Sequence, residues 1–230
     1  MTLDEWLTFS TSDLLSSNLL GLSNRKLHLL TVGFLRRVWN QLDSDHTRIA
    51  VEATEKFADG RLKLDELVHL RTTDLIDTSE FLWTVYSPCH CCYGYEDDHH
   101  IFAGVKIGVE TPACTMGKAA FHARDLVAWA AVSDEREMAI HIEIVAQLEL
   151  FREIAGPSVN PDWKLWRTET VRQVARAIYR DQSFYILPIL ADALQDAGCN
   201  DNVVLSHCRE VSDHVRGCWV VDLAMGIGHR

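Results

Sequence analysis

The sequence predicts an all-α protein: an irregular multi-helix bundle of about nine or ten helices with one long irregular loop near residues 87–116. First, apolar residues recur every three or four positions over most of the chain, which is the period of one helix face. Second, helix-capping and helix-stopping residues bracket these stretches. Third, the apolar-polar alternation of a strand is confined to residues 105–109, which is too short to predict a sheet.

The N-terminal helices follow from this period. The first is predicted to begin near Ser23. One of its faces carries Leu27, Leu30, Phe34, Leu35, Val38 and Leu42. Ser44 can cap the next helix, which ends at Asp59-Gly60. The apolar stripe of that helix consists of Ile49, Ala53 and Phe57. Residues 64–71 and 79–86 form two shorter helical stretches.

Proline and glycine residues break the helical period between residues 87 and 116, which read SPCHCCYGYEDDHHIFAGVKIGVETPACTM. A structureless loop of this length is uncommon in a compact domain, so we expect it to be functional or tied down. Helices return over residues 118–132 and 134–154, and Gly156-Pro157 ends the second of them.

Four helices with short connections are predicted in the C-terminal region, over residues 168–180, 188–197, 202–209 and 214–225. Pro188 suits a first helical turn, and Gly198 suits a left-handed residue after a helix end. Asn200 or Asp201 can cap the third of these helices, and Asp213 the fourth. A boundary at residues 156–162 separates an N-terminal region, 1–156, from a C-terminal region, 162–230, unless the two form one continuous domain.

Composition limits the classes of function. The net charge is -11, and this acidic balance argues against general attraction to nucleic acid or to an anionic membrane. We expect no membrane span, because no apolar run reaches eighteen residues, and no secretory signal, because the first ten residues lack a basic region. The seven cysteines fit reduced thiols in the cytoplasm better than a disulfide framework.

Two groups of segments are distinctive. One is at the start: MTLDEWL, SNRKLHLL, LRRVWNQL and AVEATEKFADG. The other is near the end: LPILADALQDAGCNDNVVLSHCRE and HVRGCWVVDL. They resemble a family of uncharacterised bacterial proteins that is multiplied in planctomycete genomes. The resemblance covers roughly residues 1–70 and 120–226, and it implies a compact helical cytoplasmic protein without implying any reaction.

The loop offers one candidate metal site. Cys89 and Cys92 have the spacing with which two thiolates grip one ion, and His99 or His100 follows after a short loop. Cys114 can supply a fourth ligand. Two alternatives are an exposed polar loop with reduced thiols and a redox-active Cys-x-x-Cys pair, although the pair lacks the flanking strand and helix of such centres.

The C-terminal region offers a second candidate metal site. His214 and Cys218 are four residues apart and are expected on one helix face, while His207 and Cys208 end the preceding helix. If the connecting turn folds back, three of these residues can meet around one ion. The alternative is that Cys208 and Cys218 are small core residues and that the histidines bind a carbonyl or a carboxylate.

Three further features have both a functional and a structural interpretation. Cys208 has electropositive neighbours, which would suit a nucleophilic thiol, but no sequence signature of a cysteine hydrolase surrounds it. Arg172, Arg176 and Arg180 form a basic stripe that could contact phosphates or an acidic partner helix. We expect it instead to be a solvated face paired with Glu169 and Asp181. The tryptophans at 163, 166 and 219 are expected to pack the C-terminal helices rather than to line a ligand pocket.

The sequence therefore favours a non-enzymatic cytoplasmic protein-interaction module with a regulatory or adaptor role and a protein partner, because no complete catalytic set can be assembled from neighbouring positions. The second hypothesis is a zinc-binding protein that uses either candidate site. The third is a thiol-dependent enzyme.

Overall fold

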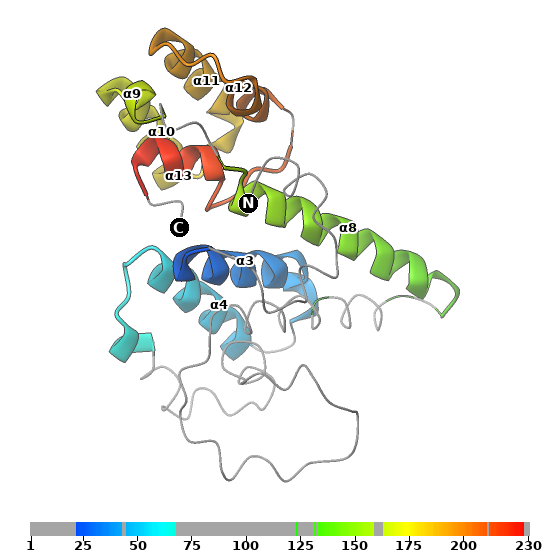
Figure 1. The fold of residues 1–230 in the computed structure, drawn as a ribbon. Helices are drawn as coiled ribbons and strands as arrows, with labels where there is room; N and C mark the ends of the chain where they lie inside the picture. Colours follow the sequence, from blue (N-terminus) through cyan, green and yellow to red (C-terminus); the bar gives the residue numbers. More distant parts are fainter. Residues whose placement is uncertain are drawn as a thin grey trace.

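A computed structural model describes residues 22–42, 45–67, 123, 131, 133–158, 163–210 and 212–227 (Figure 1). The all-α prediction is confirmed, because these residues form helices joined by turns and no strand occurs among them. Nor does any helix in these ranges combine the length and apolar character needed to cross a bilayer. The predicted loop at 87–116, the helix predicted at 79–86 and the predicted cap Ser44 lie outside the described residues, as does the helix predicted at 118–132 except for residues 123 and 131.

Helices α3 (Asn24–Arg37) and α4 (Asp45–Ala58) lie side by side. The predicted start of the first helix is confirmed, because the side chain of Ser23 accepts a hydrogen bond from the Lys26 backbone N–H. Between Val38 and Leu42 the chain forms a short 3-10 turn, Trp39–Gln41. The predicted apolar stripe of α4 is wrong at Ile49, which is 47% exposed. The buried face of the helix includes Val51 and Thr54 instead, so it is rotated relative to the predicted face.

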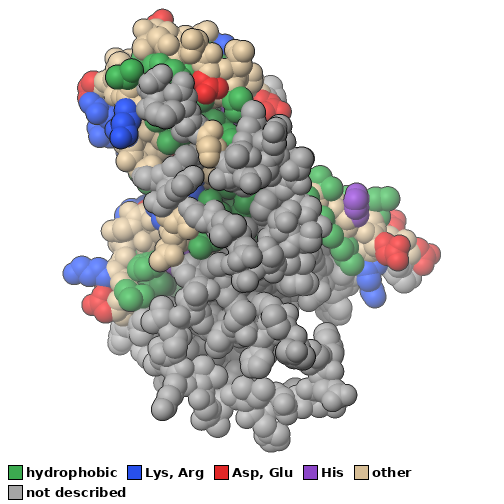
Figure 2. All heavy atoms as spheres, in the orientation of Figure 1, with side chains coloured by type: hydrophobic (Ala, Val, Ile, Leu, Met, Phe, Trp, Pro, Cys, Tyr) green, Lys and Arg blue, Asp and Glu red, His purple; other side chains and the backbone are tan. Residues whose placement is uncertain are grey.

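Helix α8 (Arg136–Ala155) follows the 3-10 turn Ser133–Glu135 and packs against α3. Their contact is close at Gly33, where an added Cβ would lie 2.6 Å from Leu150 Cδ2. Figure 2 shows apolar side chains on the part of α8 that projects from the body, and Met138, Ile142 and Val145 are exposed there. The C-terminal half of α8 instead joins α3 and α4 in one hydrophobic cluster that includes Phe34, Phe151 and Ile154.

The C-terminal residues form a second hydrophobic cluster. Its elements are α9 (Trp163–Trp166), α10 (Glu169–Asp181), the 3-10 turn Phe184–Ile186, α11 (Leu187–Asp196), α12 (Asn202–Arg209) and α13 (Trp219–Met225). The predicted helix starts and ends are confirmed at three residues. Pro188 lies in the first turn of α11, and Gly198, after the end of that helix, has a φ of 90°. Asp201 caps α12 by accepting hydrogen bonds from Val203 N and Val204 N. Residues before about 156 belong to the N-terminal hydrophobic cluster, and residues after about 162 belong to the C-terminal one. Whether the two regions fold as separate domains stays a prediction.

The last helix departs from the prediction. It begins at Trp219 rather than at His214, so His214 and Cys218 do not share a helix face and Asp213 does not cap it. The physical reason is Gly217, which has a φ of 90° and lies so close to α3 that an added Cβ would be 2.9 Å from Leu29 Cδ1. This left-handed residue redirects the chain just before α13.

Polar side chains join the two hydrophobic clusters. Arg25 of α3 donates to Asp222 of α13 at 2.5 Å and to the Tyr179 hydroxyl at 2.8 Å. Tyr179 in turn donates to Asp59, which also accepts from Arg216 at 2.8 Å. The network therefore connects α3, the end of α4, α10 and α13, which are well separated in sequence.

The structure supports the structural interpretation of the three tryptophans and of the arginine stripe. The tryptophans predicted to pack the C-terminal helices are buried: Trp163, Trp166 and Trp219. Along α10, the predicted ion pairs are present: Arg172 with Glu169 at 2.9 Å, Arg176 with Glu169 at 3.9 Å, and Arg180 with Asp181 at 2.7 Å. All of these pairs are solvent-accessible, so we assign the stripe little energetic weight.

Replacing Gly156 with alanine is expected to lower the free energy of unfolding by roughly 2–5 kcal/mol, measured by urea denaturation. Gly156 has φ 65° and ψ 158°, a conformation open almost only to glycine. An added Cβ would also lie 2.5 Å from Trp219 Cβ.

The matched control is Gly60→Ala, where φ is 68° but nothing lies within 4 Å of the added Cβ. That variant should lose only about 1 kcal/mol, from backbone strain. Equal losses for the two variants would contradict the packing role assigned to Trp219.

Candidate metal centre

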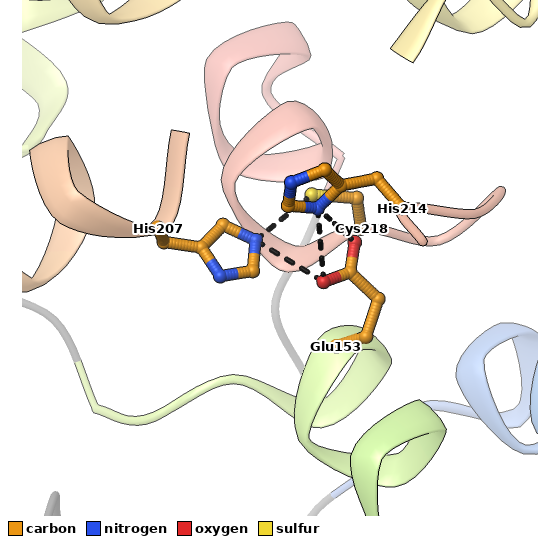
Figure 3. A group of neighbouring side chains, drawn as sticks. All are labelled: Glu153, His207, His214 and Cys218. Carbon is orange, nitrogen blue, oxygen red and sulfur yellow. Dashed lines mark hydrogen bonds and ion pairs between the residues drawn. The ribbon is translucent and has the colours of Figure 1, made fainter. Parts of the chain in front are cut away.

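Four side chains from three parts of the chain converge at the junction of α8, α12 and α13 (Figure 3). Glu153 lies in the last turn of α8, His207 lies in α12, His214 lies in the connection that follows it, and Cys218 directly precedes α13. One ligand atom of each lies within 4.8 Å of those of the other three. The arrangement therefore brings two imidazoles, a thiol and a carboxylate to one point.

The distances between these atoms fit a shared ion. His207 Nε2 lies 3.3 Å from Cys218 Sγ and 3.3 Å from Glu153 Oε2, and His214 Nδ1 lies 3.1 Å from Glu153 Oε1. Ligand atoms that surround zinc tetrahedrally at about 2.0–2.3 Å lie roughly 3.3–3.8 Å from one another. These three distances lie near that range, and all four ligand atoms lie within 4.8 Å of one another, so the side chains would have to close in to surround an ion.

Two glycines allow this convergence. Gly217 turns the chain immediately before Cys218, and Gly156 ends α8 three residues after Glu153 while packing against Trp219. Because Trp219 follows Cys218 directly, the end of α8 and the start of α13 are held in contact beside the four side chains.

Burial makes the group chemically unusual. Cys218 is fully buried, and Glu153 is only 8% exposed. The histidine side chains are 11% exposed at His207 and 5% at His214. A carboxylate removed from water is costly unless positive charge or hydrogen bonds compensate it. In the metal-free arrangement His214 Nδ1 lies within hydrogen-bonding distance of both Glu153 oxygens, and the Cys218 thiol also hydrogen-bonds to Glu153. A bound cation would compensate the buried carboxylate more fully.

The outer nitrogen of His214 is oriented in the way that metal-binding histidines require. His214 Nε2 lies 3.2 Å from Ser212 Oγ and 3.4 Å from the carbonyl oxygen of Glu210. With Nε2–H donating to that carbonyl, the lone pair of Nδ1 faces the cluster and is available to an ion. His207 packs between His214 and Trp219, with ring centroids 4.9 Å and 5.1 Å away.

The pKa shifts describe how the group holds protons without metal. Burial alone lowers the pKa of His214, but the hydrogen bond and the charge of Glu153 outweigh it and raise that pKa above its usual value. Burial lowers the pKa of His207, so its imidazole favours the neutral form that binds metals. Burial raises the pKa of the Cys218 thiol well above its usual range. A metal must therefore displace the thiol proton.

The structure brings together three of the four residues predicted at this end of the chain and excludes the fourth. Cys208 is fully buried in the C-terminal hydrophobic cluster and does not belong to the group. Neighbouring residues on a helix point about 100° apart, so His207 and Cys208 cannot both face the centre. Burial also raises the pKa of Cys208 to about 12, the opposite of what a nucleophilic thiol needs.

Glu153 is the candidate ligand that sequence reasoning missed. It lies 54 positions before His207 (207 − 153), so no local spacing connects the two residues. One signal was present: an acidic residue in the last turn of a helix opposes the helix dipole, which favours cations there. The other predicted metal site, at Cys89, Cys92, His99 and His100 with Cys114, lies outside the described residues.

No family model, curated protein or solved structure matches the chain. The resemblance to the planctomycete-type family therefore stays a prediction. The convergence of Glu153, His207, His214 and Cys218 is the feature of the described residues that bears on function.

Proposed function

We propose that this protein is a zinc-binding, non-enzymatic helical protein in which Glu153, His207, His214 and Cys218 hold one structural ion. The observation that carries the proposal is the convergence of their four ligand atoms within 4.8 Å of one another. The ion would join α8, which belongs to the N-terminal hydrophobic cluster, to α12 and α13 of the C-terminal cluster.

The donor set favours zinc over other common cations. One thiolate and two imidazoles are nitrogen and sulfur ligands, which suit zinc and are poor ligands for calcium or magnesium. The thiolate of Cys218 and the carboxylate of Glu153 carry two negative charges, so a divalent cation would make this buried centre electrically neutral. Neutrality removes the main cost of burying charge.

A structural role fits better than a catalytic one. Catalytic zinc sites keep one coordination position for water or substrate, whereas structural sites have four protein ligands. The four side chains here already supply that number, and their burial limits access from solvent. The expectation of a cytoplasmic interaction module with a protein partner is compatible with such a centre and stays a prediction.

Purified protein should bind one zinc per chain at this centre, measured by elemental analysis and by titration against a chromogenic chelator. The variants His214→Ala and Cys218→Ser should lose this ion or bind it at least about 100-fold more weakly, because each removes one of the four ligands. Zinc at 1,000 times its Kd should stabilise the wild-type protein by about 4 kcal/mol.

Two controls locate the ion. His141→Ala removes an exposed histidine from α8 and should leave binding unchanged. The double variant Cys89→Ser and Cys92→Ser tests the loop predicted from sequence. Zinc that survives His214→Ala but is lost from the double variant would contradict the proposal, as would wild-type protein that binds no zinc.

Zinc affinity should fall as pH falls, because the ion must displace protons from its ligands. The raised pKa of Cys218 keeps its thiol protonated in the metal-free protein at neutral pH, so binding releases one proton. His214, whose pKa is also raised, releases a second proton at lower pH. We expect Kd to rise by about tenfold per pH unit near pH 8 and more steeply toward pH 6.

The variant Cys218→Ser serves as the control for this titration. It lacks the thiol proton, so its weaker binding should depend on pH with a slope that is smaller by about one proton. A wild-type Kd that stays constant between about pH 6 and pH 8 would show that these ligands do not hold the ion.

A further inference from the structure

Lys26 of α3 is fully buried, which is rare for a lysine. Its Nζ donates to the carbonyl oxygen of Ile154 at 2.7 Å and to that of Ala155 at 3.1 Å. These are the last two residues of α8, and they follow Glu153 directly. The lysine therefore connects α3 to the helical turn that carries the carboxylate of the candidate metal centre.

The contact satisfies a specific need of that turn. The last carbonyls of an α-helix have no partner within the helix, and in a buried helix end they require donors from elsewhere. The ammonium group of Lys26 supplies donors to two of them. If Lys26 were removed, the carbonyls of Ile154 and Ala155 would lose these hydrogen bonds, and the last turn of α8 would be freer to fray or move.

Lys26 and Trp219 hold the same turn through different elements. Trp219 of α13 packs against Gly156, while Lys26 reaches the turn from α3. The other three ligands belong to α12, to the connection after it and to the start of α13. The position of the Glu153 carboxylate relative to those three ligands therefore depends on a contact with the N-terminal cluster.

We propose that Lys26 is a positioning residue for the metal centre: by holding the last turn of α8, it keeps Glu153 in place to bind the ion. This inference rests on the proposed zinc function. It makes the affinity for zinc depend on the docking of α3, and by thermodynamic reciprocity zinc binding stabilises that docking.

The test is the variant Lys26→Met, which keeps the length of the side chain and removes the donors. Its zinc Kd should be about 10- to 100-fold higher than that of the wild type, the usual effect of losing an outer-shell partner. The visible spectrum of the cobalt-substituted variant should also change, because it reports the geometry of the ligands. Lys26→Gln, which keeps an N–H donor, should recover part of the affinity.

Two controls separate positioning from general destabilisation. Lys56→Met removes an exposed lysine from α4 and should change neither zinc affinity nor spectrum. Val32→Ala truncates a buried residue of α3 and should lower stability, while the folded variant keeps the wild-type spectrum and Kd. If Lys26→Met does not fold, hydrogen exchange on the wild-type protein replaces it, with slower exchange expected across α3 when zinc is added.

The outcomes distinguish the two proposals. Wild-type protein that binds no zinc would overturn the proposed function. Wild-type protein that binds zinc, together with a Lys26→Met variant of unchanged Kd and unchanged cobalt spectrum, would overturn the positioning role alone. Exchange in α3 that does not respond to zinc would overturn it equally when the variant cannot be prepared.

Discussion

A buried carboxylate at the end of a helix is the constraint on which the rest of the site depends. Glu153 lies where the dipole of α8 disfavours negative charge, and it has lost nearly all contact with water. It is tolerated because two imidazoles lie within hydrogen-bonding or ion-pairing distance. Those imidazoles can reach it only if α12 and the connection to α13 fold against the end of α8. The burial of this side chain thus depends on three segments meeting at one point.

Helix α13 links this centre to the polar network between the hydrophobic clusters. Cys218 directly precedes the helix, and its carbonyl accepts a hydrogen bond from Asp222 N, one turn later. Asp222 then pairs with Arg25 of α3, whose neighbour Lys26 reaches the end of α8. Two successive residues of α3 therefore contact α13 and α8, two of the three helices that border the candidate metal centre. Movement of either helix would strain a buried polar contact, which favours one arrangement of the two clusters.

Local signals predicted much of this fold, and long-range packing explains the rest. Ser23, Pro188 and Asp201 act through residues within one turn, so their capping roles follow from sequence alone. The start of the last helix could not be predicted in this way, because the turn at Gly217 depends on its close approach to Leu29 of α3. The histidines and Cys218 stood out because of their residue types. Glu153 did not, because its partners come from another part of the chain and only the tertiary structure brings them together.

We propose that two imidazoles, one thiolate and one carboxylate coordinate one ion at the junction of α8, α12 and α13. X-ray absorption spectroscopy at the zinc edge of the purified protein tests it most directly. The account predicts one sulfur at about 2.3 Å and three nitrogen or oxygen ligands at about 2.0–2.1 Å. A first shell with two or more sulfurs would place the ion elsewhere, because Cys218 is the only sulfur in the group, and a shell without sulfur would exclude Cys218 and contradict the account.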